Sequence, residues 1–208
     1  MVEKRKKPIR VLIVDDSFFT RKVLREILLE DSEIEVVGEA KDGAEAVKQA
    51  ILLKPDVITM DYNMPKLNGA EATEKILDAL GPFPVILMVS AYTKEGAEET
   101  FISLRAGAVD FIQKPSGEIS FDLNKVQDEL LSKIKMSVGV SVKRYTALKK
   151  THESRKTSEG VASPQVIVIG ASTGGPPLVE DIIASLPADF PVGIVVAQHM
   201  PPNFTGSF

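Results

Sequence analysis

Residues 85–90 read Val-Ile-Leu-Met-Val-Ser, and this short stretch decides the class of fold. Five consecutive apolar residues without polar alternation are typical of a strand buried on both faces, as in a parallel sheet covered by helices. Similar short apolar runs occur elsewhere in the first two thirds of the chain, at residues 11–14, 35–38, 57–60 and 109–112.

Segments with helical spacing of apolar residues separate these runs. They cover residues 20–29, 44–53, 70–80 and 95–105, and a fifth follows at 123–134. Strands that alternate with helices in this way predict an α/β fold, with a five-stranded, doubly wound parallel sheet that carries helices on both faces.

A second, shorter α/β pattern follows a basic segment. Residues 143–156 carry a net charge of +5, so the rest of the chain carries −9. After them come an apolar run at 166–169, a Gly-rich turn, a helix near 178–185 and a run at 192–197. We therefore predict a first domain over residues 1–135, a flexible basic linker over 136–163, and an incomplete second, Rossmann-like α/β domain over 164–208, because so few elements rarely bury a core alone.

Composition excludes several classes of protein. The chain has 208 residues, of which 44% are hydrophobic and 26% charged, so it is not disordered throughout. It has no Cys and only two His, which excludes disulfide scaffolds, cysteine nucleophiles and His-rich zinc sites. A net charge of −4, without a long apolar run or a secretory signal, predicts a cytoplasmic protein that neither binds nucleic acid nor inserts into membranes.

Five polar residues follow the predicted strands of the first domain. Asp15 and Asp16 follow the first strand and Asp61 the third, while Ser90 ends the fourth and Lys114 comes after the fifth. Each one alone is explained as a helix cap, a loop residue or a solvated charge. Since parallel strands end at one edge of a sheet, where ligands bind, the five together predict a functional site.

The chemistry of these side chains suggests phosphoryl transfer. Three carboxylates in one place repel each other unless a cation is bound, and Mg²⁺ suits Asp15 and Asp16 as ligands. Asp61 is then the nucleophile toward a phosphoryl group, while Lys114 neutralises charge on its oxygens. Ser90 is placed to donate a hydrogen bond to the phosphate, which would draw its loop inward as a switch.

These motifs resemble those of response-regulator receiver domains, over about residues 8–134. The resemblance rests on Val14-Asp15-Asp16-Ser17, Met60-Asp61-Tyr62-Asn63-Met64-Pro65, Ser90-Ala91 and Lys114-Pro115.

The resemblance implies a flavodoxin-like fold whose Asp61 is phosphorylated by a histidine kinase. It also implies that the backbone carbonyl of Asn63 helps Asp15, Asp16 and Asp61 to hold Mg²⁺, and that Phe111 is the switch aromatic. Receiver domains more often have Tyr at this position, so any hydroxyl-dependent step is absent here. Phe111 as a plain core residue of the fifth strand remains an open alternative.

The second constellation is Gly170-Ala171-Ser172-Thr173-Gly174-Gly175, between a strand and a predicted helix. Gly-x-Ser-x-Gly in this context is typical of a turn that exposes a nucleophilic serine, although a Gly-rich turn also cradles phosphate. The pattern does not match the dinucleotide-binding fingerprint, which leaves that function as a weaker alternative. His199 follows the next strand, so it lies at the same sheet edge as Ser172 if the two strands are parallel. It is then either a general base for Ser172 or an ordinary loop histidine. His152 lies in the basic segment and is assigned no role.

The Gly-rich turn, the Gln198-His199-Met200-Pro201-Pro202 turn and the receiver together resemble the chemotaxis protein-glutamate methylesterase (CheB) family. The resemblance implies that Ser172 is the nucleophile and His199 the general base, with Thr173 next to the oxyanion site. The implied substrates are glutamyl methyl esters on the cytoplasmic helices of chemoreceptors, with glutamine deamidation in some members. Our leading hypothesis for its control is relief of inhibition, in which the unphosphorylated receiver covers the Ser172 site and phosphorylation of Asp61 loosens that interface.

One departure from this family bears on activity. The family's third catalytic residue is an Asp well after the His, whereas no Asp or Glu follows His199, and Asp181 and Asp189 precede it. Since loss of the orienting acid costs about 10⁴ in turnover, we expect this 208-residue polypeptide not to be a competent esterase. One alternative is a phosphoacceptor module with a non-functional tail. Another is a DNA-binding regulator that uses the basic segment, although residues 166–208 contain no helix-turn-helix pattern.

Overall fold

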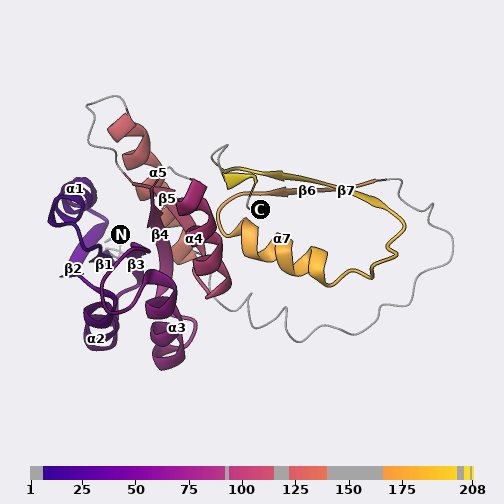
Figure 1. The fold of residues 1–208 in the computed structure, drawn as a ribbon. Helices are drawn as coiled ribbons and strands as arrows, with labels where there is room; N and C mark the ends of the chain where they lie inside the picture. The colour runs from indigo at the N-terminus through magenta and orange to yellow at the C-terminus, as the bar shows by residue number, and fades with distance from the viewer. Residues whose placement is uncertain (1–6, 92–93, 115–121, 140–165, 201–203, 207) are drawn as a thin grey trace, which may run out of the picture.

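The computed structural model describes residues 7–91, 94–114, 122–139, 166–200, 204–206 and 208 (Figure 1). Most of the predicted linker, His152, Pro115 and the pair Pro201-Pro202 lie outside the described residues. The elements in chain order are β1 (Ile9–Val14), α1 (Phe18–Leu29), β2 (Ile34–Ala40), α2 (Gly43–Leu53), β3 (Val57–Met60), α3 (Gly69–Leu80), β4 (Val85–Ser90), α4 (Lys94–Arg105), β5 (Asp110–Gln113), α5 (Asp122–Gly139), β6 (Val166–Ala171), α7 (Gly175–Ala184) and β7 (Gly193–Gln198).

The first domain contains a five-stranded sheet in the order β2-β1-β3-β4-β5. All four strand pairs are parallel. This is the flavodoxin-like order, and it confirms the predicted fold. β4 lies between β3 and β5, and all six of its residues are buried, as its apolar sequence predicts.

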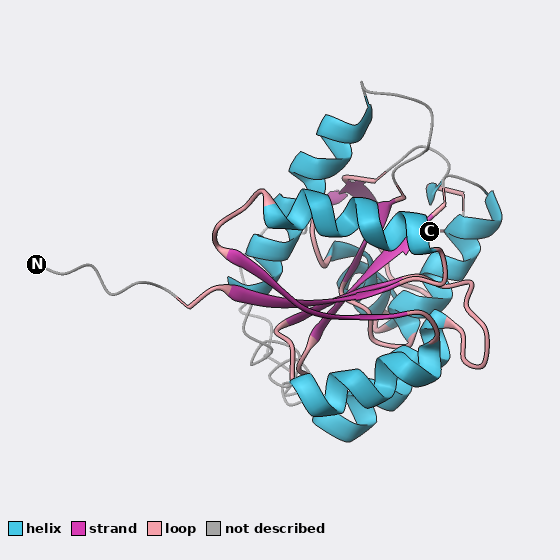
Figure 2. Cartoon of the chain, turned by 90° about the vertical axis from the view of Figure 1, so that its left-hand side faces the viewer, coloured by secondary structure: helices cyan, strands magenta, loops and turns pink. Residues whose placement is uncertain are grey.

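Helices cover both faces of this sheet (Figure 2). In β1, Leu12 and Val14 belong to the core beneath α2, α3 and α4, whereas Val11 and Ile13 belong to the core beneath α1 and α5. Successive side chains of a strand point to opposite faces, so an uninterrupted apolar strand supplies both cores. This explains why the strands show no polar alternation.

Side-chain caps determine where several helices begin. Ser17, Asp42 and Asn68 each accept a backbone hydrogen bond from the residue three positions later, and Asn68 forms a reciprocal capping box with Glu71. These helices begin one or two residues before the predicted starts, because apolar spacing becomes visible only after the cap. α5 ends at Gly139, five residues beyond the predicted end, so it extends into the first residues predicted as linker.

The second part of the chain contains a β-α-β unit in which β6 and β7 pair in parallel. This unit is the start of a second α/β domain, as predicted. This second part of the chain contacts the first domain at α4 and β5: Arg105 Nη2 lies 2.9 Å from Glu180 Oε1, and the rings of Phe111 and Phe204 stack 4.5 Å apart. Figure 1 shows α7 beside α4. Among the described helices, none has the length and apolar character needed to cross a bilayer.

Gly69 lies where α3 packs closely against the strand-end loop that carries Asp61. A Cβ atom at position 69 would collide with the carbonyl oxygen of Asp61 and lie 2.9 Å from Tyr62 Cα. We therefore expect Gly69→Ala to lower the free energy of unfolding by about 1–3 kcal/mol, the usual cost of overpacking. Denaturant unfolding followed by circular dichroism measures this change.

Gly193→Ala is the matched control for this substitution. No atom lies within 4 Å of the Cβ position at Gly193, so the same added methyl group should change stability by less than about 0.5 kcal/mol. Equal stability of the two variants would contradict the close packing at Gly69.

Candidate functional site

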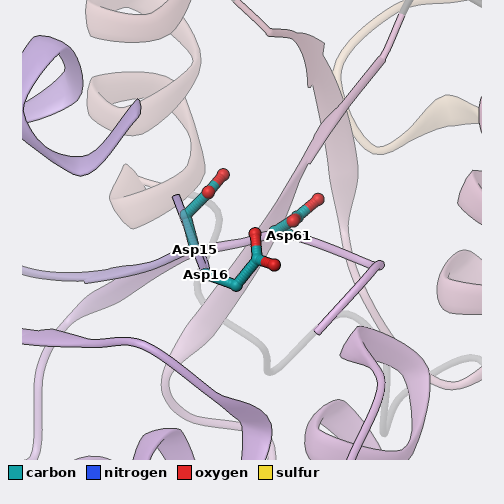
Figure 3. Close-up of side chains that lie close together, drawn as sticks. All are labelled: Asp15, Asp16 and Asp61. Carbon is teal, nitrogen blue, oxygen red and sulfur yellow. The ribbon is translucent and has the colours of Figure 1, made fainter. Parts of the chain in front are cut away.

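Three carboxylates gather at the carboxyl ends of β1 and β3 (Figure 3). Asp15 and Asp16 follow β1 directly, and Asp61 follows β3. One oxygen from each lies within 4.8 Å of an oxygen of the others. Asp15 and Asp61 are buried, whereas Asp16 is exposed. The topology thus brings the three residues together, while their roles as nucleophile and metal ligands remain predictions.

Lys114 joins two of these carboxylates. Its Nζ atom lies 2.9 Å from Asp15 Oδ2 and 2.9 Å from Asp61 Oδ2. Burial opposes the charged form of Lys114, but the hydrogen bonds and charges of Asp61 and Asp15 together outweigh it and raise the pKa of the ammonium group. The backbone N–H of Lys114 also donates to the Ser90 carbonyl at 2.7 Å, which continues the β4–β5 pairing up to the site.

Burial raises the pKa of Asp61 to about 6, and the charge of Asp15 adds to this effect. Lys114 and the N–H of Tyr62, which donates to Asp61 Oδ1 at 2.8 Å, act in the opposite direction without cancelling it. In the absence of a further cation, the carboxyl group is therefore harder to ionise than an exposed aspartate.

The donor set fits a hard divalent cation. Three carboxylates and one ammonium leave two net negative charges when all four groups are ionised, which a 2+ ion neutralises. Carboxylate oxygens are the ligands that Mg²⁺ prefers, and one exposed carboxylate leaves room for its waters. Asn63, the predicted backbone ligand, is exposed, and its side chain donates to Glu99 of α4 at 2.8 Å.

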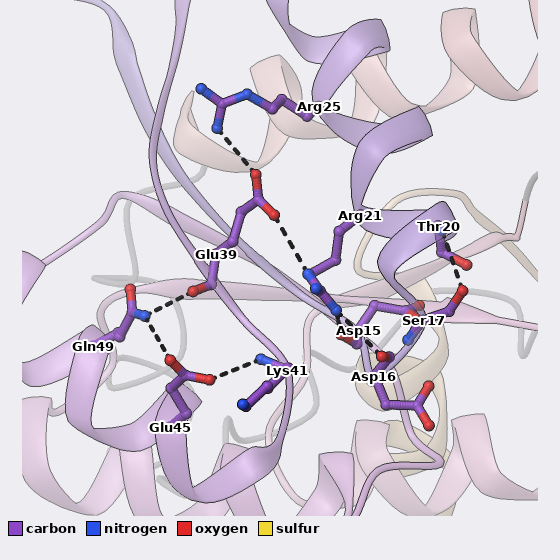
Figure 4. A network of polar contacts seen from close by, with 10 residues as sticks. All are labelled: Asp15, Asp16, Ser17, Thr20, Arg21, Arg25, Glu39, Lys41, Glu45 and Gln49. Carbon is purple, nitrogen blue, oxygen red and sulfur yellow. Dashed lines mark hydrogen bonds and ion pairs between the residues drawn. The ribbon is translucent and has the colours of Figure 1, made fainter.

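Arg21 is a site residue that sequence reasoning missed. Its guanidinium donates to the backbone carbonyls of Asp15 at 2.8 Å and Asp16 at 3.2 Å, and its Nε lies 3.3 Å from a carboxylate oxygen of Glu39 (Figure 4). Glu39 also pairs with Arg25. The sequence offered one signal, since Arg21 and Arg25 lie four residues apart on one helix face, next to a strand that ends near an acidic residue. Arg21 fixes the backbone from which both carboxylates project.

The two predicted switch residues are both buried. The Ser90 hydroxyl donates to the Gly96 carbonyl at 2.9 Å, which ties the end of β4 to α4. The Phe111 ring stacks on Phe204 with an interplanar angle of 7°, and Lys133 Nζ lies 5.1 Å from its centroid. Phe111 therefore belongs to the core and also to the contact with the second part of the chain, so both interpretations of this residue stay open.

Ser172 lies in a tight turn between β6 and α7. The Gly175 N–H donates to the Ser172 carbonyl at 2.7 Å, and Gly174 adopts a left-handed φ of 71°, which favours glycine. The His199 N–H donates to the Ala171 carbonyl at 3.1 Å, so the parallel pairing places Ser172 and His199 at the same strand ends. Both residues are exposed.

Thr173 and Gln198 complete this turn. Thr173 is half-buried next to Ser172. Gln198, which sequence reasoning missed, donates from Nε2 to the Ser172 carbonyl at 3.0 Å and to the His199 carbonyl at 3.1 Å. It therefore bridges the two predicted catalytic positions through their backbones.

The raised pKa of Asp61 makes a prediction about stability. Its value is about 6 in the folded chain against 3.8 for an ordinary aspartate, so the folded state binds the proton more tightly. The free energy of unfolding should therefore fall as pH rises between about 4 and 6, and stay lower above that range. Asn cannot ionise, so we expect Asp61→Asn to raise the free energy of unfolding at pH 7 by up to about 3 kcal/mol in metal-free buffer. Urea unfolding of both proteins with EDTA at pH 4 and pH 7 measures this difference in the free energy of unfolding.

The exposed Asp128 of α5 provides the control. Asp128→Asn should leave stability nearly unchanged at both pH values. A gain for Asp61→Asn that was the same at pH 4 and pH 7 would show that ionisation is not its cause.

Comparison with known proteins identifies two families whose profiles match different parts of this chain. The family profile of the response regulator receiver domain matches residues 11–122, and that of the CheB methylesterase matches residues 167–208. A curated Thermotoga maritima protein, named protein-glutamate methylesterase/protein-glutamine glutaminase, is 52% identical over 200 residues, which are 96% of this chain and 57% of the relative. The chain thus spans little more than half the length of that relative.

Two solved structures resemble the first domain. The crystal structure of the response regulator domain of Thermotoga maritima CheB is 52% identical, with a TM-score of 0.58, and covers 65% of this chain and 99% of that one. A chain from the crystal structure of the CheX-CheY-BeF₃-Mg²⁺ complex of Borrelia burgdorferi is 32% identical, with a TM-score of 0.52, and covers 65% of this chain and 92% of that one.

Proposed function

Because this chain belongs to the CheB family, in which a response-regulator receiver is joined to a methylesterase segment, we propose that it is a phosphorylation-controlled regulator of chemotaxis. Its receiver would accept a phosphoryl group on Asp61. The methylesterase of which residues 167–208 form part would then hydrolyse glutamyl methyl esters on chemoreceptors.

The observation that carries the first half of this proposal is the cluster of Asp15, Asp16, Asp61 and Lys114. In the proposed reaction, an Asp61 oxygen attacks the phosphorus atom, and the bond from phosphorus to the donor's leaving group breaks with its electron pair on that group. When bound to Asp15, Asp16, Asp61 and the Asn63 carbonyl, Mg²⁺ would supply positive charge to the phosphoryl oxygens. Lys114 would supply further charge, because its ammonium already lies 2.9 Å from Asp61.

The proposed phosphodonor is a histidine kinase of the chemotaxis system, because an imidazole is a good leaving group for transfer to a carboxylate. The Borrelia complex named above contains Mg²⁺ and BeF₃, which supports a cation at the matching cluster here. Ser90 would leave the Gly96 carbonyl and donate to the new phosphate, which would loosen the end of β4 from α4.

The second half of the proposal concerns Ser172 and His199. The Ser172 hydroxyl would attack the ester carbonyl while His199 takes its proton, and methanol would leave with that proton. Water would then hydrolyse the acyl-enzyme and restore the serine. The backbone beside Thr173 would stabilise the oxyanion, and the same site would deamidate glutamine with loss of ammonia.

The fold of residues 166–200 does not support the DNA-binding alternative. Residues 166–200 form a parallel β-α-β unit rather than a helix-turn-helix. This β-α-β unit instead contacts the receiver at α4 through Glu180 and at β5 through Gly174, which supports a regulatory role for the receiver over the Ser172 site.

A chimaera provides the test of the whole proposal. Residues 1–208 of this chain are joined to the remaining C-terminal part of the Thermotoga maritima relative, and methanol release from methylated chemoreceptor is measured with and without acetyl phosphate and Mg²⁺. We expect ester hydrolysis that rises with the phosphodonor. Phosphorylation of Asp61 without any hydrolysis would reduce the function to that of a phosphoacceptor module.

A further inference from the structure

A buried carboxylate of the receiver holds the loop that carries Ser172. Asp110, the first residue of β5, is 3% exposed, and its two oxygens have different partners. Oδ1 accepts from the Phe111 N–H at 2.8 Å and lies 3.4 Å from Lys133 Nζ, within the receiver. Oδ2 accepts from the Gly174 N–H at 3.3 Å, in the second part of the chain. The carboxylate thus links the two parts directly.

The position of this contact bears on catalysis. Gly174 is the N-cap of α7, lies two residues after Ser172, and has no side-chain cap of its own. The N-terminus of a helix carries partial positive charge and attracts anions. A serine esterase uses N–H groups of this same turn to stabilise the negative oxygen formed in its reaction. A receiver carboxylate at this turn adds negative charge beside the place where an oxyanion would form.

Contacts within the receiver hold the Asp110 side chain in place. Lys133 of α5 donates to the Phe111 carbonyl at 2.6 Å and lies 3.4 Å from Asp110, so both residues at the start of β5 depend on one ammonium group. Burial raises the pKa of the Asp110 carboxyl, and Lys133 and the N–H groups of Phe111 and Gly174 oppose that rise. β5 leads directly to Lys114, which contacts Asp61. One short strand therefore connects Asp110 to the residue that contacts the phosphoacceptor.

The rest of the contact keeps the Ser172 turn against β5. Val109 Cγ1 lies 3.5 Å from the Cβ position of Gly174, Phe204 stacks on Phe111, and Glu180 pairs with Arg105. Of these contacts, the Arg105–Glu180 pair is exposed and the Asp110–Gly174 bond is part-buried. A charge-assisted hydrogen bond that is partly shielded from water contributes more than an exposed ion pair.

We propose that Asp110 is an inhibitory positioning residue, which in the unphosphorylated chain binds the Gly174 N–H and disfavours oxyanion formation at Ser172. Phosphorylation of Asp61 would recruit Lys114 to the phosphate, shift β5 and release Gly174. The inhibition is thus electrostatic. This inference rests on the proposed esterase function, but the hydrogen bond itself does not.

Amide hydrogen exchange by NMR in the 208-residue chain tests the contact. Asp110→Asn keeps the size of the side chain and removes its charge. We expect the Gly174 amide to exchange about tenfold faster in this variant, because a neutral amide oxygen accepts a weaker hydrogen bond than a carboxylate does. Asp128→Asn, the same change on the exposed face of α5, should leave the exchange of Gly174 unchanged. Equal exchange in wild type and Asp110→Asn would overturn the proposal.

A second measurement needs no substitution at Asp110. Acetyl phosphate with Mg²⁺ should accelerate Gly174 exchange in the wild-type chain but not in Asp61→Asn. Unchanged exchange in fully phosphorylated wild type would overturn the proposed release, even if Asp110→Asn proved too unstable to study.

Ester hydrolysis by the chimaera separates this inference from the proposed function. Asp110→Asn should raise hydrolysis in the absence of phosphodonor several-fold and reduce the further stimulation by acetyl phosphate. Faster Gly174 exchange without higher basal hydrolysis would overturn the inhibitory role. No hydrolysis by any chimaera, phosphorylated or not, would instead contradict the proposed esterase and remove the inhibitory role with it, while the exchange data would still decide the contact.

Discussion

Asp61→Asn is expected to reduce the incorporation of phosphate from acetyl phosphate to the background level. The carboxylate oxygen is the proposed attacking atom, and the amide that replaces it is neutral and a poor nucleophile. The substitution also removes one of the three carboxylates that gather within 4.8 Å, so the cluster would hold Mg²⁺ more weakly. Radiolabelled phosphate retained on the purified 208-residue chain, with Mg²⁺ and with EDTA, measures the effect.

The control for this labelling is again Asp128→Asn, which leaves the cluster intact. Wild type and this control should incorporate label only with Mg²⁺, and hydroxylamine should release the label as expected for an acyl phosphate. If Asp61→Asn incorporated label at the wild-type rate, the phosphoacceptor would be a different residue, and Asp15 would be the first to test, because Lys114 contacts it equally closely.

Ser172→Ala is expected to lower ester hydrolysis by the chimaera at least about 10³-fold, in the range found when the nucleophile of a serine hydrolase is removed. The backbone turn should survive, because its bonds from Gly175 and Gln198 are made to the Ser172 carbonyl and not to its hydroxyl. Methanol release from phosphorylated chimaera measures the loss. The same chimaera should keep its phosphate incorporation, which shows that the receiver is unaffected.

Ser185→Ala provides the matched control. Ser185 is exposed at the end of α7, and its hydroxyl donates only locally, to the Ile182 carbonyl at 2.7 Å. Its loss should change hydrolysis less than twofold. Substantial hydrolysis by Ser172→Ala would exclude the serine mechanism and favour the alternative in which the Gly-rich turn binds an anion.

The sheet and the convergence of its polar residues could be predicted because both follow from local sequence. The run at residues 85–90 is apolar on both faces and lies inside the sheet, and Asp15 and Asp61 meet because parallel strands end at one edge. The ends of helices were less predictable. Ser17 caps α1 through its side chain, a contact that apolar spacing does not reveal.

The residues that sequence reasoning missed act through hydrogen bonds that apolar spacing does not reveal. Arg21 binds the backbone of Asp15 and Asp16, and Asp110 binds Gly174, 64 positions away. Such bonds depend on how elements pack and on side-chain rotamers, which periodicity does not encode. Sequence alone identified Phe111 only as a possible switch or core residue, because its partner Phe204 lies far along the chain.

The parallel stack of Phe111 on Phe204 limits which residues position 111 can hold. Phe111 is 2% exposed and Phe204 is fully buried, so a tyrosine at position 111 would bury a hydroxyl that needs a new partner. The downstream segment thus restricts which aromatic side chain position 111 of the receiver can hold without loss of stability.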